Sequence, residues 1–361
     1  MNGERLADWY LAVVGGRPGV VATLVRALLA VASWGYALGL VVREATWRCG
    51  LMRPLRVRAK VVSVGNLTLG GTGKTPAVVH LAQRYLAAGE RVAVLLRGHG
   101  ARRLTGVNVV SDGPRTLLGV ADAGDEAVLT ARLLPGVPVL AGKDRRLTAR
   151  AAVDHFGATV LLLDDGFQYR RLWVDEHIVL LDATQPFGTG RLFPAGTLRD
   201  PRCALRRAAQ VWFTRTDAPG ATPVADLARE VARWAPGVPV ARTRHRPVRL
   251  RRLGSAEQLA PAALAQRRVV ALAGIGNPRA FEATLASLGA SVVARAFFPD
   301  HHRFAAAELA AVAAQPEEVW VVTTEKDAVR LAESDAWPAA GAPLWVLGID
   351  LTHEPAGGAD A

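Results

Sequence analysis

Residues 64–76 read Val64-Gly65-Asn66-Leu67-Thr68-Leu69-Gly70-Gly71-Thr72-Gly73-Lys74-Thr75-Pro76, and this stretch decides the fold. Its glycines let consecutive backbone N–H groups turn inward around phosphate oxygens, and its lysine can reach the outer phosphates. The threonine hydroxyl suits Mg²⁺, and the proline is tolerated in the first turn of a helix. Because an apolar run precedes it, the stretch predicts a strand, a phosphate-binding loop and a helix at 77–88, and it indicates a chain that uses ATP.

The strict pattern G-x-x-x-x-G-K-[ST] places glycine at position 68, where this chain has Thr68. A glycine-rich turn that only joins a strand to a helix is the alternative, but it leaves the adjacent lysine and threonine unexplained. We therefore expect nucleotide contacts throughout the loop, from Thr68, Leu69, Gly70, Gly71, Thr72, Gly73, Lys74 and Thr75.

Composition indicates a folded chain with an anionic partner. The 361 residues, 50% of them hydrophobic, can bury a large core and suggest about two domains. Two cysteines argue against a disulfide framework. The formal net charge of +12 fits nucleic acid, an acidic membrane surface or a phosphorylated substrate. No nucleic-acid motif, aromatic stacking platform or zinc spacing favours the first.

Residues 1–50 favour the membrane. Residues 19–42 are nearly all apolar, and only Arg26 interrupts them. The uninterrupted part, 27–42, is shorter than the ~20 residues of a spanning helix, so we expect a helix in the lipid interface, with the cations that follow it near anionic headgroups. A signal peptide and a helix packed on the protein's own core are the alternatives. The cations are Arg43, Arg48, Arg53, Arg56, Arg58 and Lys60.

Short apolar runs alternate with helical stretches beyond residue 58, which predicts an α/β fold with a parallel sheet. We expect a phosphate-loop domain over 51–217, followed by a linker and a smaller α/β domain over 218–361. The basic stretch 242–252 has the composition of a connector. Expected strands are 61–64, 92–96, 137–141, 160–163, 178–181, 211–213, 269–273, 291–296, 319–323 and 344–347.

Acidic residues follow one of the expected strands. Asp164 and Asp165 end an apolar run, which places carboxylates at the same sheet edge as the phosphate loop. That arrangement suits Mg²⁺, although the acids can also cap the turn that follows. Taken alone, three further groups are weaker candidates: residues 124–126 (Gly-Asp-Glu), residues 300–302 (Asp-His-His) and the loop 190–201, which carries two arginines.

These blocks together resemble the tetraacyldisaccharide 4'-kinases of lipid A synthesis, from the N-terminal helix to near residue 350. The family also carries Ser or Thr where the strict loop has its first glycine, so Thr68 supports the resemblance. The matching blocks are residues 64–76, 97–100, 124–126, 142–146, 163–168, 190–201, 272–278, 298–302 and 323–329.

The resemblance implies a P-loop NTPase-like parallel-sheet domain, a membrane-associated N-terminal helix and a second, smaller α/β domain. It implies an enzyme that uses ATP and Mg²⁺ to phosphorylate the 4'-hydroxyl of an acylated glucosamine disaccharide 1-phosphate. The expected location is the cytoplasmic face of the inner membrane, as a peripheral or monotopic protein on an anionic lipid surface, with no nucleic acid.

The resemblance also implies roles for individual residues. Asp125 is the expected base, assisted by His301 or by its neighbour His302. Phosphate contact is expected from Lys74 and from Arg199 or Arg191. Metal ligation is expected from Thr75 together with one of Asp164, Asp165 and Asp200, and contact with substrate or with the site residues from Glu126, Gln168 and Arg191.

Three positions depart from the family's usual pattern, and two other classes of protein remain as alternatives. His99 stands where tyrosine is common, Tyr169 where histidine is common and Asp200 where glutamate is common. A regulatory GTPase normally reads guanine with Asn/Thr-Lys-x-Asp, whereas residues 324–327 here are Thr-Glu-Lys-Asp. A basic membrane-binding or nucleic-acid-binding module is supported by charge alone.

Overall fold

The computed structural model describes residues 3–102, 106–316, 318–334, 337–338 and 341–355. Its chain forms two compact units, and neither is continuous in sequence. Unit 1 comprises Met1–Lys74, Leu163–Arg244 and His353–Ala361, and unit 2 comprises Thr75–Leu162 and His245–Thr352.

Parallel strands form the sheet of unit 1, in the order β1 (Lys60–Asn66), β6 (Glu176–Asp182), β7 (Gln210–Thr214) and the first part of β8 (Val240–Arg252). Their apolar residues are buried almost continuously, as expected for parallel strands covered on both faces. Because the strands share one direction, the polar residues Asn66 and Asp182 end at one edge of this sheet. The phosphate loop leaves β1 at that edge.

The remaining elements of unit 1 are helical. They are α1 (Gly3–Val14), α2 (Val20–Arg48), the 3₁₀ helix η1 (Arg202–Arg207) and α7 (Val224–Trp234). Leu205 of η1 and Leu227 of α7 are buried against Phe167 and Phe213, in a core cluster that also includes residues of β6 and β7.

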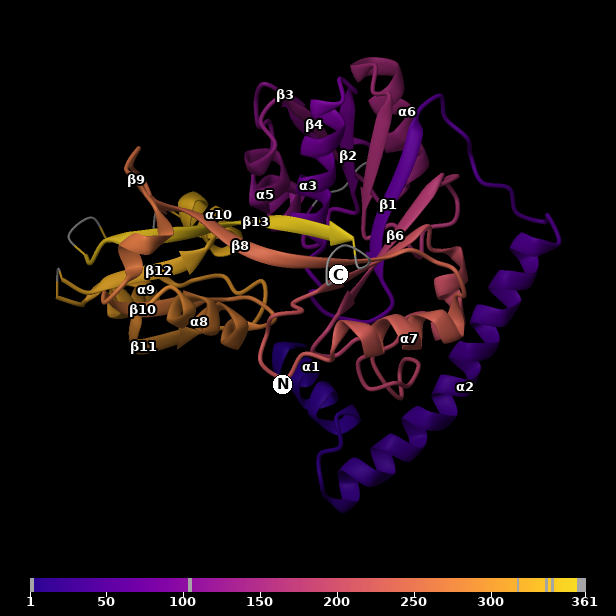
Figure 1. Cartoon of the computed structure of the whole chain (residues 1–361), viewed down its shortest axis with the longest axis horizontal. Coiled ribbons are helices and arrows are strands. Elements are labelled where there is room, and N and C mark those ends of the chain that lie inside the picture. The colour runs from indigo at the N-terminus through magenta and orange to yellow at the C-terminus, as the bar shows by residue number, and fades with distance from the viewer. Residues whose placement is uncertain (1–2, 103–105, 317, 335–336, 339–340, 356–361) are drawn as a thin grey trace, which may run out of the picture. The chain divides into compact units, whose positions relative to one another are not determined.

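Helix α2 is the long helix labelled in Figure 1 and has 29 residues. Large apolar side chains are exposed along it and form a stripe. By length and composition it can cross a membrane, and its most apolar window is only 6% buried, whereas a helix inside a protein core is mostly buried. The helix extends beyond the apolar run used for the sequence prediction, which judged the segment too short to span. The stripe recurs at helical spacing: Val20, Val21, Leu24, Leu28, Val31, Trp34, Leu38, Val41 and Val42.

The other side of α2 holds the loop 190–201. The Ser33 hydroxyl donates to the carbonyl of Leu192 at 3.0 Å, and the Tyr36 hydroxyl donates to the carbonyl of Arg199 at 2.8 Å. About two turns further on, Arg43 Nη2 pairs with Asp200 Oδ1 at 2.6 Å. The helix with the exposed apolar stripe therefore also fixes the backbone that carries Arg199.

The first part of unit 2 contains a sheet with strand order β5-β2-β4-β3, in which β3 runs antiparallel to β4. The sequence analysis did not predict β3. Along the chain, the elements are α3 (Lys74–Ala87), β2 (Val92–Leu96), β3 (Asn108–Gly113), α4 (Val120–Ala123), α5 (Asp125–Leu133), β4 (Val137–Ala141), α6 (Arg145–Phe156) and β5 (Val160–Asp164).

The second part of unit 2 has parallel strands in the order β11-β10-β12-β13 (Figure 1). Separate core clusters form around Phe281 and Trp345 and around Phe304 and Leu309. Its elements are β9 (Gln258–Leu259), η2 (Pro261–Leu264), β10 (Arg268–Ala273), α8 (Pro278–Ser287), β11 (Ser291–Phe297), α9 (Ala306–Ala313), β12 (Trp320–Thr324), α10 (Glu325–Ser334) and β13 (Leu344–Pro355).

The expected α/β architecture is confirmed, and each strand predicted from an apolar run is present within two residues of its expected bounds, except β13, which continues eight residues beyond 347. The basic stretch 242–252, whose composition predicts a connector, is part of strand β8. Ala241, Thr243 and Leu250 are buried along it, and Leu250 pairs with Leu259 of β9. Buried and more exposed residues therefore alternate along part of β8, but the many arginines hide this pattern in the sequence.

Candidate functional site

The loop after β1 has the backbone of an anion site. Gly70 has φ 108° and Gly73 has φ 84°, which are conformations that side-chain-bearing residues rarely adopt. Leu69 N–H donates to the carbonyl of Thr197 at 2.7 Å, so the loop is held against the loop 190–201. Because α3 begins at Lys74, the free N–H groups of its first turn lie at the end of the glycine loop.

The fit to a nucleotide phosphate rests on this backbone and on one side chain. The Thr72 hydroxyl oxygen is buried and has no hydrogen-bond partner among the described residues. A side chain placed at Gly70 or Gly71 would meet no atom within 4 Å, so the loop leaves open space beside its backbone. Loop, helix N-terminus and Lys74 together fit a triphosphate.

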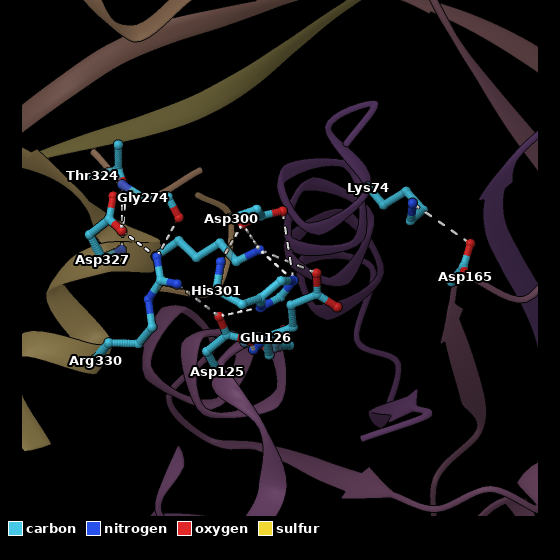
Figure 2. Close-up of polar contacts among 12 residues, drawn as sticks. Lys74, Asp125, Glu126, Asp165, Gly274, Asp300, His301, Thr324, Asp327 and Arg330 are labelled. Carbon is cyan, nitrogen blue, oxygen red and sulfur yellow. Dashed lines mark hydrogen bonds and ion pairs between the residues drawn. The ribbon is translucent and has the colours of Figure 1, made fainter. Parts of the chain in front are cut away.

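Lys74 and Arg199 converge on Asp165 (Figure 2 shows the lysine and the acid). Lys74 Nζ lies 3.7 Å from Asp165 Oδ1, and the two terminal nitrogens of Arg199 donate to the Asp165 oxygens at 2.9 and 2.8 Å. Arg199 Nη2 also donates to Asn66 Oδ1. Burial alone would lower the pKa of Arg199, but hydrogen bonding and the charge of Asp165 raise it. The cluster holds two cations beside the phosphate loop.

Asp200 is 1% exposed and makes contacts of another kind. Its Oδ1 pairs with Arg43, and its Oδ2 accepts from Arg207 and Gln168, each at 3.2 Å. The same Gln168 amide donates to the carbonyl of Asn66 at 3.0 Å. Both oxygens of Asp200 have cationic partners, so this acid stabilises the loop 190–201, and its expected metal ligation stays a prediction.

The other expected metal ligands lie at the end of β5 and at the start of α3. Asp164 is the last residue of β5 and is 5% exposed, and Thr75 is the second residue of α3. Among the described residues, no three His, Cys, Asp or Glu side chains form a metal-binding group. Mg²⁺ usually takes only one or two protein carboxylates, with water and substrate phosphates completing its shell, so the oxygen donors present fit it.

Arg191, the other arginine from which phosphate contact is expected, is exposed.

A second polar group lies within unit 2, where α5 begins at Asp125 (Figure 2). His301 Nδ1 lies 2.8 Å from Asp125 Oδ2, and Glu126 N–H donates to Asp125 Oδ1 at 2.9 Å. Gly124 precedes them with φ 87°, and a Cβ there would lie 2.2 Å from the carbonyl oxygen of His99. Only glycine allows the approach that places the acid.

Neighbouring charges keep Asp125 ionised. Its carboxylate is 5% exposed, and burial alone would raise its pKa. The hydrogen bond with His301 and the positive charges of Lys326 and Arg330 lower the pKa below its ordinary value. For His301, the hydrogen bond with Asp125 raises the pKa, although burial and Lys326 oppose that effect.

Helix α10 supplies these cations, and buried Asp327 fixes the helix. Asp327 Oδ1 accepts from Gly274 N–H at 3.1 Å, and Thr324 donates to Oδ2 at 2.6 Å. Arg330 is 7% exposed, donates to Asp327 and to the carbonyl of Gly274, and directs Nη1 toward Asp125 at 3.8 Å. Residues 272–278 and 323–329 therefore meet behind the Asp125–His301 pair.

The structure distinguishes the two histidines geometrically. His301 contacts Asp125, whereas His302 Nε2 contacts Glu308 at 2.9 Å and its ring stacks on Phe298. Glu126 lies near Lys326, at 3.6 Å.

Residues that the sequence analysis did not select also belong to these groups. Asn66 ends β1, Asp182 ends β6, and Arg215 follows β7 and donates to the carbonyl of Gly71 at 3.0 Å. The rule that parallel strands end at one sheet edge would have identified them. Lys326 and Arg330 gave no such signal, because a helix of unremarkable composition carries them.

Comparison with known proteins places this geometry in context. A family model described as tetraacyldisaccharide-1-P 4'-kinase matches residues 25–360. A tetraacyldisaccharide 4'-kinase of Anaeromyxobacter dehalogenans is 47% identical over 92% of this chain and 88% of its own length. That of Syntrophus aciditrophicus is 42% identical over 91% and 89%. The crystal structure of LpxK from Aquifex aeolicus in complex with ATP has a TM-score of 0.74 and 29% identity, and covers 91% of this chain and 95% of that one.

Proposed function

Because the chain belongs to the tetraacyldisaccharide 4'-kinase family and is an ATP-dependent kinase of lipid A biosynthesis, we propose that its phosphate loop and its Asp125–His301 pair serve the two halves of the transfer. The 4'-hydroxyl oxygen of the disaccharide 1-phosphate forms a bond to the γ-phosphorus of ATP. The bond from that phosphorus to the β,γ-bridging oxygen breaks, ADP leaves, and the hydroxyl proton passes to the base.

The part of the site that would bind ATP acts through its charges and through the position in which it holds the phosphates. Phosphoryl transfer needs the nucleotide held in line and the growing negative charge spread over nearby donors. Backbone N–H groups of the loop, Lys74 and Arg199 are those donors. Asp165 lies against both cations, at 3.7 Å from the lysine and 2.8 Å from the arginine, so it keeps them directed beside the loop.

Mg²⁺ fits the oxygen donors of this half, with Thr75 and either Asp164 or Asp165 as the residues that hold it. When bound, the ion neutralises phosphate charge and orients the chain of phosphates. The protein's own residues bind the loop phosphates and hold Lys74 and Arg199.

For the acceptor half, the single observation that carries the assignment is the 2.8 Å contact between His301 Nδ1 and Asp125 Oδ2. A lone aspartate has an intrinsic pKa of ~3.9 and is a weak base at neutral pH. The adjoining imidazole orients the carboxylate and shares the proton that it receives, so the pair is a better base than the acid alone. Glu126, beside Asp125 and partly exposed, is placed to contact the sugar.

Replacing His301 by alanine tests the acceptor half. We expect His301→Ala to lower kcat/KM for 4'-phosphorylation by about 10²-fold, because Asp125 loses its proton partner. His302→Ala is the matched control, since that ring contacts Glu308, and its kcat/KM should stay within about threefold of wild type. Equal losses in both variants would contradict the assignment.

For the anchor, we propose that α2 lies in the cytoplasmic leaflet with its apolar stripe in lipid. The acyl chains of the substrate sit in the bilayer, and extracting them would cost ~0.8 kcal/mol per methylene. Arg53 and Arg58 are exposed and suit anionic headgroups. The other expected headgroup cations are paired within the protein: Arg43 with Asp200, Arg48 with Glu44, Arg56 with Trp173 and Lys60 with Glu176.

Vesicle flotation tests the anchor. The double variant Leu28→Glu/Leu38→Glu places charges in the apolar stripe, and we expect binding to phosphatidylethanolamine–phosphatidylglycerol vesicles to fall at least about tenfold. Leu117→Glu, at an exposed apolar side chain in unit 2, is the control and should bind as wild type does. Unchanged binding of the double variant would refute the anchor.

A further inference from the structure

Lys326 occupies a central position beside the Asp125–His301 pair. Its ammonium lies 3.3 Å from His301 Nε2, 3.0 Å from Asp300 Oδ1 and 3.6 Å from Glu126 Oε1, and its side chain is 18% exposed; Figure 2 labels these three partners. On the same face of α10, one turn later, Arg330 is directed at Asp125. The two ends of the pair therefore face different cations of one helix.

The contacts of the His301 ring select one proton arrangement. Nδ1 faces a carboxylate oxygen at 2.8 Å, so Nδ1 carries the proton and donates it. Nε2 lies 3.3 Å from an ammonium group, which has three donors and no acceptor, and 3.7 Å from Asp300 Oδ2; because the ammonium is the nearer group, Nε2 presents its lone pair. The arrangement that satisfies both contacts is the neutral ring protonated at Nδ1.

We infer that Lys326 is a positioning residue that holds His301 neutral in this tautomer, so that the Asp125–His301 pair retains one negative charge and can accept the proton of the sugar hydroxyl. This inference rests on the proposed role of the pair. A second proton on Nε2 would point at the ammonium group, and a pair that already carried that proton would no longer serve as a base.

The charges around His301 determine the direction of the effect. Three carboxylates face the ring region, from Asp125 and Glu126 of α5 and from Asp300, and the His99 ring lies 5.7 Å away between centroids. The opposing cations are Lys326 and Arg330. Without Lys326, these carboxylates would favour the imidazolium form with less opposition, so the pKa of His301 would rise further.

A titration of the histidine rings measures this directly. Full-length protein with ¹⁵N-labelled histidine, in mild detergent, is followed by NMR against pH, and the His301 signals are those lost in His301→Gln. We expect Lys326→Met to raise the pKa of His301 by about one unit and to weaken the preference for protonation at Nδ1. The acid limb of kcat/KM should move to higher pH, with most activity recovered above it. Lys326→Arg should keep the wild-type values, and Lys60→Met controls for loss of a surface ion pair.

A purely structural ion pair with Asp300 would give another pattern. Lys326→Met would then lower stability, shift the His301 pKa by no more than about 0.2 unit and leave the preference for protonation at Nδ1 unchanged. That result would overturn the inference. If the methionine variant does not fold, the pKa and the tautomer of His301 are measured in Lys326→Gln, for which the same results are expected. The proposed role of the pair is judged separately, by whether Asp125 variants keep phosphoryl transfer, so the two ideas can fail independently.

Discussion

Asp125→Asn is expected to lower kcat/KM for 4'-phosphorylation by about 10³-fold while the protein stays folded and still binds ATP. The amide has almost the same shape as the carboxylate but cannot accept the hydroxyl proton. It also removes the negative charge that His301 Nδ1 contacts at 2.8 Å and that Arg330 faces at 3.8 Å. The measurement is steady-state transfer of labelled phosphate, with ATP binding determined in parallel.

Asp122→Asn is the matched control, because that acid is exposed on α4, three residues before Asp125. Its kcat/KM should remain near wild type. If Asp125→Asn retained more than about a tenth of wild-type activity, Asp125 would not be the base, and proton acceptance would have to be assigned to another group.

Lys74→Ala is expected to lower kcat by about 10²- to 10³-fold and to weaken ATP binding as well. Its ammonium is the first cation after the glycine loop, and the guanidinium of Arg199 does not replace it, because Asp165 and Asn66 already hold that group. The loss of one cation should also leave Asp165 with a single cationic partner. Single-turnover transfer at saturating ATP separates the chemical step from binding.

Lys60→Ala is the control for Lys74→Ala, since Lys60 pairs with Glu176 at a strand terminus and is 42% exposed. It should leave kcat unchanged. A Lys74→Ala enzyme that lost ATP affinity alone, with kcat intact at saturation, would limit the lysine to ground-state binding.

The sequence predicted the elements that position the site because their signals are local. Continuous apolar runs predicted buried parallel strands such as β1 and β10. The glycines, the lysine and the threonine after β1 predicted the phosphate loop. Strand β8 was missed because arginine dominates its composition, and the described α2 is longer than its uninterrupted apolar run. Such departures reflect tertiary pairing, which overrides local composition.

The site was predictable as a set of residues and less so as a set of contacts. Asp125 and His301 are 176 positions apart, and only the fold brings His301, rather than His302, to the acid. Asp200 had the chemistry of a metal ligand, but Arg43 and Arg207 occupy its oxygens. Lys326 lies in the block 323–329, which supports the family resemblance and argues against a GTPase, but neither argument gives the lysine a role. Ion pairs between residues far apart in the chain produce no regular pattern in the sequence, so they could not be predicted from it.

The most direct test combines purified protein in mild detergent, γ-labelled ATP, Mg²⁺ and the acylated disaccharide 1-phosphate. Wild-type enzyme should place label at the 4' position, and omission of Mg²⁺ or either substitution, Asp125→Ala or Lys74→Ala, should nearly abolish it. Label transfer that persists in both variants, or a folded wild type that binds ATP and phosphorylates no position of this lipid, would contradict the account.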